Sequence, residues 1–225
     1  MKYRIFSLYV TCAWAFFSHG SDAQQRLRGP PRYDKAHLVE RIIGRKSLLI
    51  ISRSIYFRCD YPICVQSCLD GRYHHVYRHT LSYFNKRKKV QKRQGPKVSR
   101  TAYMHVLRRR IDDTPILVIN AFMGRNATDP KVSGRYDIFF ATAVCFVVGT
   151  QVANLSSATH NFDRRQARNS ACLLWRKAVA TEQEQVPCRR AFETHCRYYY
   201  GYKFIYRSDI CMSATHTEQS MCAIQ

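Results

Sequence analysis

The chain has 225 residues, which is enough for one domain with a sizeable core. It carries 37 lysines and arginines against 15 aspartates and glutamates, a formal net charge of +22. Such a surface attracts polyanions, namely glycosaminoglycans, anionic membranes, acidic proteins or nucleic acid, but charge alone gives no specificity. No segment beyond residue 23 reaches the ~18 uncharged apolar residues of a membrane-spanning helix, so we expect no membrane span.

Residues 1–23 are typical of a secretory signal peptide, with Lys2 and Arg4 before an apolar run and small residues near its end. We therefore expect residues 24–225 to form a single secreted, extracellular domain whose cysteines pair as disulfides. Cys12 lies in the signal, so nine of the ten cysteines stay, and the odd one is free or pairs between chains. Two sequons, at Asn126 and Asn154, are candidate glycosylation sites.

The next segment predicts a helix over residues 34–44, since Asp34 suits the N-cap, apolar residues recur with helical spacing and Gly44 suits the end. A second helix is predicted over residues 184–199. Runs of β-branched and aromatic residues predict strands between and after them. These runs are residues 47–58, 72–84, 101–110, 116–123, 135–148, 171–177 and 202–207. One domain of antiparallel strands with a helix near each end predicts a closed β-barrel.

A strongly basic run occupies residues 86–97, where we expect a turn between two strands, and residues 149–169 predict a polar loop. The run is a candidate polyanion-binding site of the heparin-binding kind, and the alternative is a solvated hairpin tip. Nucleic-acid modules interleave such cations with aromatic stacking residues, which this run lacks, so we expect no nucleic-acid partner. Its cations are Lys86, Arg87, Lys88, Lys89, Lys92 and Arg93.

Residues suited to metal binding or catalysis are present without a recognisable arrangement. The histidine and cysteine spacings match no structural zinc pattern, and secreted cysteines oxidise. No Gly-x-Ser-x-Gly motif or defensible pair of acids occurs. We therefore expect no metal site, no cofactor and no enzymatic activity. The residues considered for zinc are His74, His75, His79, Cys59, Cys64 and Cys68.

The last third of the chain carries a cysteine pattern that resembles the tick salivary lipocalins, the family that includes the histamine-binding proteins. A cysteine precedes a tryptophan in Cys172-Leu173-Leu174-Trp175, Pro187-Cys188 opens a helix that carries Cys196, and a short aromatic strand leads to Cys211. Ile63-Cys64-Val65 and Cys145-Phe146-Val147-Val148 also resemble family elements.

This resemblance implies an eight-stranded antiparallel β-barrel with an N-terminal and a C-terminal helix packed outside, stabilised by disulfides. By analogy, Cys64 would pair with Cys211, Cys145 with Cys188 and Cys172 with Cys196. Cys59, Cys68 and Cys222 are left over, and any two of them could form a further bridge. The function implied is that of a salivary monomer that binds and sequesters a small host mediator.

The acids of the amine-binding members are replaced here by Phe146 and Leu173. Strand alternation places a row of residues on the inner face, opposite Cys145 and Cys172. An apolar wall disfavours a cation without a partner and favours a lipid, such as a fatty acid or eicosanoid, whose carboxylate meets Arg53 or Arg135. The predicted inward residues are Tyr136, Ile138, Phe140, Thr142, Val144, Phe146, Leu173 and Trp175.

Three alternatives stay open. The aromatic residues of the predicted wall also suit plain barrel packing, because small barrels are often filled by their own side chains. A biogenic amine, histamine or serotonin, would require other acids in the pocket. A third possibility is a scaffold whose basic surface binds a glycosaminoglycan or an acidic protein of the complement or clotting systems.

Overall fold

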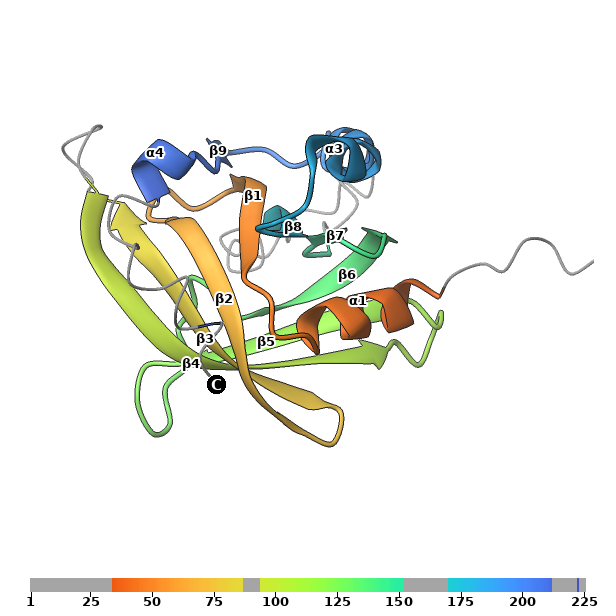
Figure 1. Cartoon of the computed structure of the whole chain (residues 1–225), viewed down its shortest axis with the longest axis horizontal. Helices are drawn as coiled ribbons and strands as arrows, with labels where there is room; N and C mark the ends of the chain where they lie inside the picture. The colour runs from red at the N-terminus through yellow and green to blue at the C-terminus, as the bar shows by residue number, and fades with distance from the viewer. Residues whose placement is uncertain (1–33, 87–93, 152–169, 212–221, 223–225) are drawn as a thin grey trace, which may run out of the picture. The chain divides into compact units, whose positions relative to one another are not determined.

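The structure, a computed structural model, describes residues 34–86, 94–151, 170–211 and 222 (Figure 1). The predicted signal peptide, residues 1–23, lies outside these residues. Residues 33–225 form one compact unit, to which every element below belongs. Among the described residues, no helix has the length and apolar character needed to cross a membrane.

Within the described residues, a helix comes first, eight strands follow, and a helix, a short strand and a helical turn come last. In chain order they are α1 (Lys35–Ile43), β1 (Leu49–Tyr56), β2 (Pro62–Tyr73), β3 (Val76–Lys86), β4 (Gln94–Arg108), β5 (Pro115–Phe122), β6 (Gly134–Ala141), β7 (Cys145–Gly149), β8 (Ala171–Lys177), α3 (Glu182–His195), β9 (Tyr202–Ile205) and α4 (Ser208–Cys211).

The strands form an antiparallel sheet in which β2 to β8 pair in chain order and β8 then pairs with β1. The sheet closes because β1 also pairs with β2, with Leu49 opposite Ser67 and Ile50 opposite Gln66. The result is the eight-stranded barrel visible in Figure 1, and the predicted fold class is confirmed. Closure removes the exposed strand edges that would otherwise pair with other chains.

Helix α1 closes one end of this barrel. Asp34 caps it by accepting a hydrogen bond from the Ala36 backbone N–H at 3.1 Å, and the helix ends at Gly44, as predicted. Its apolar stripe, which includes Val39 and Ile42, joins the same core cluster as the inward side chains of the strands. The burial of this stripe holds the helix against the barrel.

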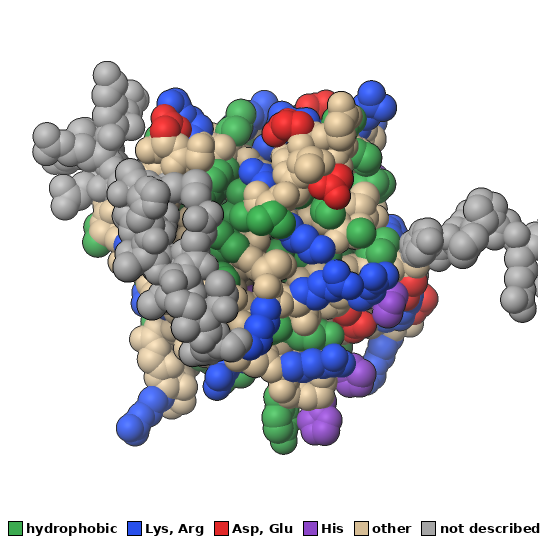
Figure 2. Space-filling model, in the orientation of Figure 1, with side chains coloured by type: hydrophobic (Ala, Val, Ile, Leu, Met, Phe, Trp, Pro, Cys, Tyr) green, Lys and Arg blue, Asp and Glu red, His purple; other side chains and the backbone are tan. Residues whose placement is uncertain are grey.

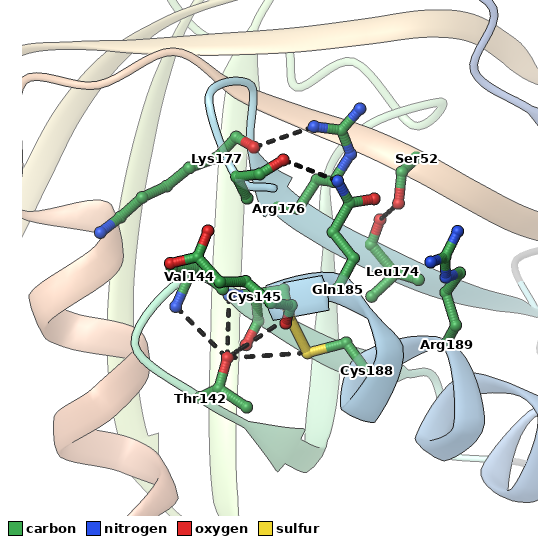
Figure 3. The surroundings of a disulfide bond; sticks show 12 residues. Ser52, Thr142, Val144, Cys145, Leu174, Arg176, Lys177, Gln185, Cys188 and Arg189 are labelled. Carbon is green, nitrogen blue, oxygen red and sulfur yellow. Dashed lines mark hydrogen bonds between the residues drawn. A yellow bond between two sulfur atoms is a disulfide. The ribbon is translucent and has the colours of Figure 1, made fainter. Parts of the chain in front are cut away.

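Helix α3 packs on the outside, against β6, β7 and β8. A capping box between Thr181 and Glu184 starts it at Glu182, before the predicted residue 184. It ends at His195, short of the predicted residue 199, with Cys196 as its cap. Disulfides join it to the barrel, and Figure 3 shows one of them, between β7 and the first half of α3.

Strand β9 fills a gap in the barrel wall. Because β1 and β2 pair only near Leu49 and Ile50, the rest of that edge of β1 pairs with β9, from Arg53 opposite Ile205 to Tyr56 opposite Tyr202. A disulfide between β2 and the end of α4 encloses this segment on its other side. The predicted last strand thus forms and completes the wall between β1 and β2.

Strand boundaries differ from prediction in several places. Strand β2 lies between the predicted strands 47–58 and 72–84, and the second of these begins only at Val76, because the chain turns at His74, where φ is +52°. The predicted strand 101–110 begins at Gln94, within the predicted turn 86–97. The predicted strand 135–148 is two strands, β6 and β7. The turn between them is held by the Thr142 hydroxyl, which accepts hydrogen bonds from the Val144 and Cys145 backbone N–H groups at 3.3 Å.

Candidate functional site

Among the described residues, the barrel interior is packed with side chains. The predicted inner residues Tyr136, Ile138, Phe146, Leu173 and Trp175 are all 5% exposed or less and belong to one core cluster. The ring of Phe146 stacks on Trp175 with centroids 6.2 Å apart. An internal void of about 10 Å³, whose lining includes Tyr136, Leu173 and Trp175, has room for a single water molecule at most. The alternative of plain core packing therefore describes this part of the barrel.

Phe140 does not share the inner face, which corrects the prediction. The pairing of β6 with β7 slips between Ile138 and Phe140, so Phe139 is an extra residue on β6. A bulge of this kind turns the following side chain to the opposite face. Phe140 packs with Phe139 and Val144 in the outer cluster beneath α3, and Thr142 lies in the turn.

A larger cavity, of about 480 Å³, lies at the end of the barrel opposite α1. It is bounded by the last residues of β1, the first of β6 and β8, and the segments that follow β7 and precede β6. Tyr56, Lys131 and Tyr136 line both this mouth cavity and the internal void, so they separate the two. The described residues lining the mouth cavity are Tyr56, Arg58, Pro130, Lys131, Ser133, Gly134, Arg135, Tyr136, Thr150, Gln151, Ser170 and Ala171.

The floor of the mouth cavity is made by two tyrosines. Tyr56 and Tyr136 are 4% and 5% exposed, and the Tyr136 ring folds over Gly134, where a Cβ would lie 2.8 Å from its hydroxyl oxygen. Burial raises the pKa of Tyr136 to about 12 and that of Tyr56 well above its ordinary value. Both phenols are therefore neutral at physiological pH, and the floor is an aromatic surface without negative charge.

The rim of the mouth cavity is cationic. Among its described lining residues, Arg58, Lys131 and Arg135 are positive and none carries a carboxylate. Arg58 is neutralised from outside the lining by both carboxylate oxygens of Asp60, at 2.7 and 2.9 Å, and these hydrogen bonds lower the pKa of Asp60. Arg135 is exposed and forms no ion pair with the carboxylates of the described residues.

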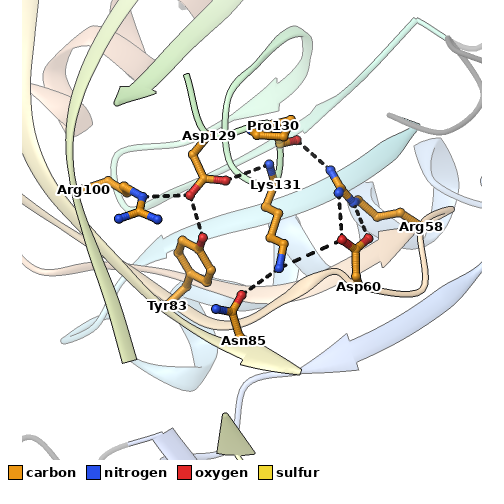
Figure 4. Close-up of polar contacts among 8 residues, drawn as sticks. All are labelled: Arg58, Asp60, Tyr83, Asn85, Arg100, Asp129, Pro130 and Lys131. Carbon is orange, nitrogen blue, oxygen red and sulfur yellow. Dashed lines mark hydrogen bonds and ion pairs between the residues drawn. The ribbon is translucent and has the colours of Figure 1, made fainter. Parts of the chain in front are cut away.

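A polar network holds the loop that carries Lys131, as Figure 4 shows. The buried carboxylate of Asp129 accepts hydrogen bonds from the Tyr83 hydroxyl at 2.6 Å and from Arg100 Nε at 2.9 Å. Burial works to raise the pKa of Asp129, but these hydrogen bonds outweigh it and hold the pKa below its usual value. Lys131 Nζ donates to Asn85 Oδ1 at 2.7 Å and lies 4.0 Å from Asp60 Oδ2, and these two contacts fix its ammonium beside the cavity.

Arg53, the other predicted partner of a ligand carboxylate, lies elsewhere. It forms an ion pair with Glu193 of α3 at 3.0 Å, on the outside of the barrel. The register of β1 on β8 shifts between Ile51 and Arg53, which turns Arg53 away from the face that alternation would assign to it. Of the two predicted arginines, the structure places Arg135 alone at the mouth.

The cysteines pair as the resemblance implied. The structure forms Cys64–Cys211, Cys145–Cys188 and Cys172–Cys196, and a fourth disulfide joins two of the leftover cysteines, Cys68 and Cys222. Cys59 is exposed and pairs with no cysteine of the described residues. Because these cysteines are oxidised, and His79 is buried on β3, no cluster of metal-ligating residues forms in the described part of the chain.

The remaining predicted sites are mostly outside the described residues. Asn126 is exposed in the segment after β5, which suits a glycosylation site, whereas Asn154 lies outside the described residues. Lys86 is the last residue of β3, and its side chain is not described. The other predicted polyanion-binding residues, which are Arg87, Lys88, Lys89, Lys92 and Arg93, also lie outside the described residues.

Sequence reasoning missed Tyr56, Arg58 and Lys131. Tyr56 and Arg58 end a predicted strand, so their place at the mouth follows once the barrel is closed. Lys131 carries no signal of its own in the sequence, because its place depends on the Asp129 network and on its bond to Asn85.

Comparisons with known proteins give structural matches only. No family model matches the chain, and no curated protein matches it. The solved structures that match include japanin from Rhipicephalus appendiculatus bound to cholesterol, at 14% sequence identity and a TM-score of 0.46, over 73% of this chain and 94% of that one. Apocrustacyanin C2 matches at 10% identity and a TM-score of 0.42, over 72% of this chain and 78% of that one. The topology described above, a closed eight-stranded antiparallel β-barrel, is the fold class that the sequence resemblance implied.

Proposed function

We propose that this lipocalin-like barrel binds a small amphipathic anion in the mouth cavity and sequesters it. The observation that supports the proposal is the lining itself: three cations, of which Arg58 and Lys131 pair with Asp60, no carboxylate among the described lining residues, and a floor of two buried tyrosine rings. An anionic group would meet Arg135, which forms no ion pair in the described residues, while an apolar body would lie on Tyr56 and Tyr136.

The position of the cavity modifies the ligand expected from the sequence. A fatty acid or eicosanoid remains the favoured class, but its hydrocarbon lies in the 480 Å³ mouth cavity and not in the barrel interior, where about 10 Å³ is open. Histamine or serotonin would bring an ammonium beside Arg58, Lys131 and Arg135 without a lining acid to receive it, which is electrostatically unfavourable.

The biological role follows from sequestration. Four disulfides are typical of a protein that matures in an oxidising compartment, which supports secretion. A secreted binding protein of the kind that the sequence resembles would remove a host mediator from its receptors. No catalytic step is part of this proposal.

The test is native mass spectrometry of the disulfide-bonded protein with arachidonate, a leukotriene, cholesterol, histamine and serotonin. We expect adducts with the anionic lipids at low ligand concentration and none with the amines. Arg135→Gln should weaken arachidonate binding about tenfold or more, since a hydrogen bond to a charged group is worth about 1.5–3 kcal/mol. Arg53→Gln is the matched control and should leave binding unchanged.

Two outcomes would contradict the proposal. Histamine or serotonin binding without lipid binding would show that the lining cations do not govern the ligand. Equal loss of arachidonate affinity in Arg53→Gln and Arg135→Gln would place the carboxylate away from the mouth cavity.

A further inference from the structure

A group of cations surrounds the C-terminal end of α1, at the end of the barrel opposite the mouth cavity. Arg41 lies in the last turn of α1 and Arg45 follows the helix, and both are exposed. Lys177 ends β8, and its side chain extends away from that of Arg176 (Figure 3). The pairing of β1 with β8 places Lys177 opposite Leu49, four residues after Arg45, and the Ala178 backbone N–H donates to the Leu48 carbonyl oxygen at 2.8 Å. In agreement with this geometry, partial burial and then the charges of Arg45 and Arg41 lower the pKa of Lys177. We call Arg41, Arg45 and Lys177 the closed-end cluster.

The nearby acids do not neutralise the closed-end cluster. Glu184 attracts Lys177, but its carboxylate is held in the capping box, accepting hydrogen bonds from the Thr181 backbone N–H at 2.8 Å and from the Thr181 hydroxyl at 2.9 Å. The carboxylate of Glu40 lies near the phenol of Tyr77 on β3, whose pKa is raised by burial and also by the charge of Glu40. Within the described part of the chain, no ion pair joins Arg41, Arg45 or Lys177 to a carboxylate.

The chemistry of the closed-end cluster suits sulfate groups. Guanidinium forks bind the oxygens of a tetrahedral oxyanion in pairs, and an ammonium adds a point charge. Arg41 lies in the last turn of α1, and Arg45 follows two residues after the helix ends, with its backbone N–H donating to the Ile42 carbonyl oxygen at 3.4 Å. In Figure 2, lysine and arginine side chains, shown in blue, gather over the place that α1 occupies in Figure 1.

We infer that the closed-end cluster is a docking surface for a linear sulfated polysaccharide. Such a chain carries closely spaced anions that match a row of cations, and it occurs in the extracellular space to which a protein with four disulfides belongs. This surface differs from the basic run at residues 86–97 that the sequence analysis identified, because it lies at the ends of α1 and β8.

The two ends of the barrel act independently under this inference. Strand β8 runs from Ala171, which lines the mouth cavity, to Lys177, a span of about 20 Å at ~3.3 Å per residue. A polysaccharide on the closed-end cluster therefore leaves the mouth open. The inference does not rest on the ligand proposed for the mouth cavity and can fail or hold without it.

The test is heparin affinity of the full disulfide-bonded chain as a function of salt. The triple variant Arg41→Gln, Arg45→Gln and Lys177→Gln should elute at clearly lower salt. The slope of log affinity against log salt should fall by up to about three, one for each lost contact that releases a counterion.

The matched control removes the same charge elsewhere, through Arg78→Gln, Arg125→Gln and Arg190→Gln. These exposed arginines lie on β3, in the segment after β5 and on α3. We expect this variant to elute close to the unchanged protein. A second measurement uses the unchanged protein: heparin should protect Lys177 from acylation, as read by mass spectrometry of its peptide.

Four results would overturn the inference. Equal shifts in the two triple variants would show an effect of net charge alone. Acylation of Lys177 at the same rate with and without heparin would place the polysaccharide elsewhere. Loss of retention on neutralising residues 86–93, with the closed-end variant still retained, would assign heparin binding to that run. Binding of phosphatidylserine vesicles by the closed-end cluster without heparin retention would replace the polysaccharide with a membrane.

Discussion

His79 is a fully buried histidine that links β3 to α1. Its ring contacts the Ile43 carbonyl oxygen through Nε2 at 2.9 Å and the Ser67 hydroxyl through Nδ1 at 2.9 Å. Since a carbonyl oxygen accepts only, Nε2 carries the proton and Nδ1 accepts from Ser67. Burial lowers the pKa of His79 to about 4, so the ring is neutral in the folded protein.

This burial predicts an acid-sensitive fold. In the unfolded chain His79 takes up a proton near pH 6.5, whereas in the folded chain it does so near pH 4. Its contribution to stability is therefore complete above pH 6.5 and is lost as the pH falls from 6.5 to 4, by about 3 kcal/mol in total. Urea unfolding at pH 7.5, 5.5 and 4.5 measures this loss. In the His79→Gln variant, the free energy of unfolding should depend less on pH. If the free energy of unfolding of that variant falls with pH as steeply as in the unchanged protein, other titrating groups cause the acid sensitivity.

At the scale of elements, Gly201 determines whether β9 can approach β1. Its φ is +132°, a conformation that side chains disfavour, and a Cβ there would lie 2.1 Å from the Tyr56 carbonyl oxygen. Tyr56 also lines the mouth cavity. The short strand β9 and the cavity floor are therefore coupled through one backbone contact.

Gly201→Ala should loosen β9 and destabilise the barrel. Gly124→Ala is the matched control, because Gly124 has a similar φ of +141° with no atom within 4 Å of an added Cβ. Strain alone should cost the control about 1–3 kcal/mol, and Gly201→Ala should cost more because the clash adds to the strain. Thermal unfolding of both variants gives the comparison. Equal losses of stability would mean that β9 moves aside without cost.

At the scale of the whole molecule, the filled barrel separates the place where a ligand binds from the core. Trp175 reports on this separation, since it is 2% exposed, lines the internal void and is the one tryptophan after residue 23. Tyr56 and Tyr136 lie between it and the mouth cavity. A ligand held at the mouth should therefore leave the environment of its indole unchanged.

Tryptophan fluorescence during an arachidonate titration tests this prediction on the chain lacking residues 1–23. We expect saturation by mass spectrometry with little change in the emission maximum of Trp175 or in its protection from iodide. A large shift or quench at saturation would show that Tyr136 moves aside and that the ligand enters the barrel interior. The mouth cavity would then be an entrance and not the binding site.

The sequence alone predicted most of the fold. The caps at Asp34 and Gly44 are local signals, and α1 forms between them. The cysteine pattern, through its resemblance, implied three of the disulfides that the structure forms. The inward placement of Phe146 and Leu173 followed from alternation along β7 and β8, whose pairing has no irregularity.

The candidate site depended on tertiary structure, for a physical reason. Alternation assigns a face only while the register is unbroken, and one extra residue, Phe139, moved Phe140 from the inside to the outside. The role of a charged side chain depends on which residues lie beside it in the fold. Arg53 forms an ion pair with Glu193, whereas Arg135 lines the mouth cavity without an ion pair in the described residues. The sequence by itself thus determined a disulfide-bonded barrel with an aromatic core, and closure of the barrel decided that the core is filled and that the cationic cavity lies at its mouth.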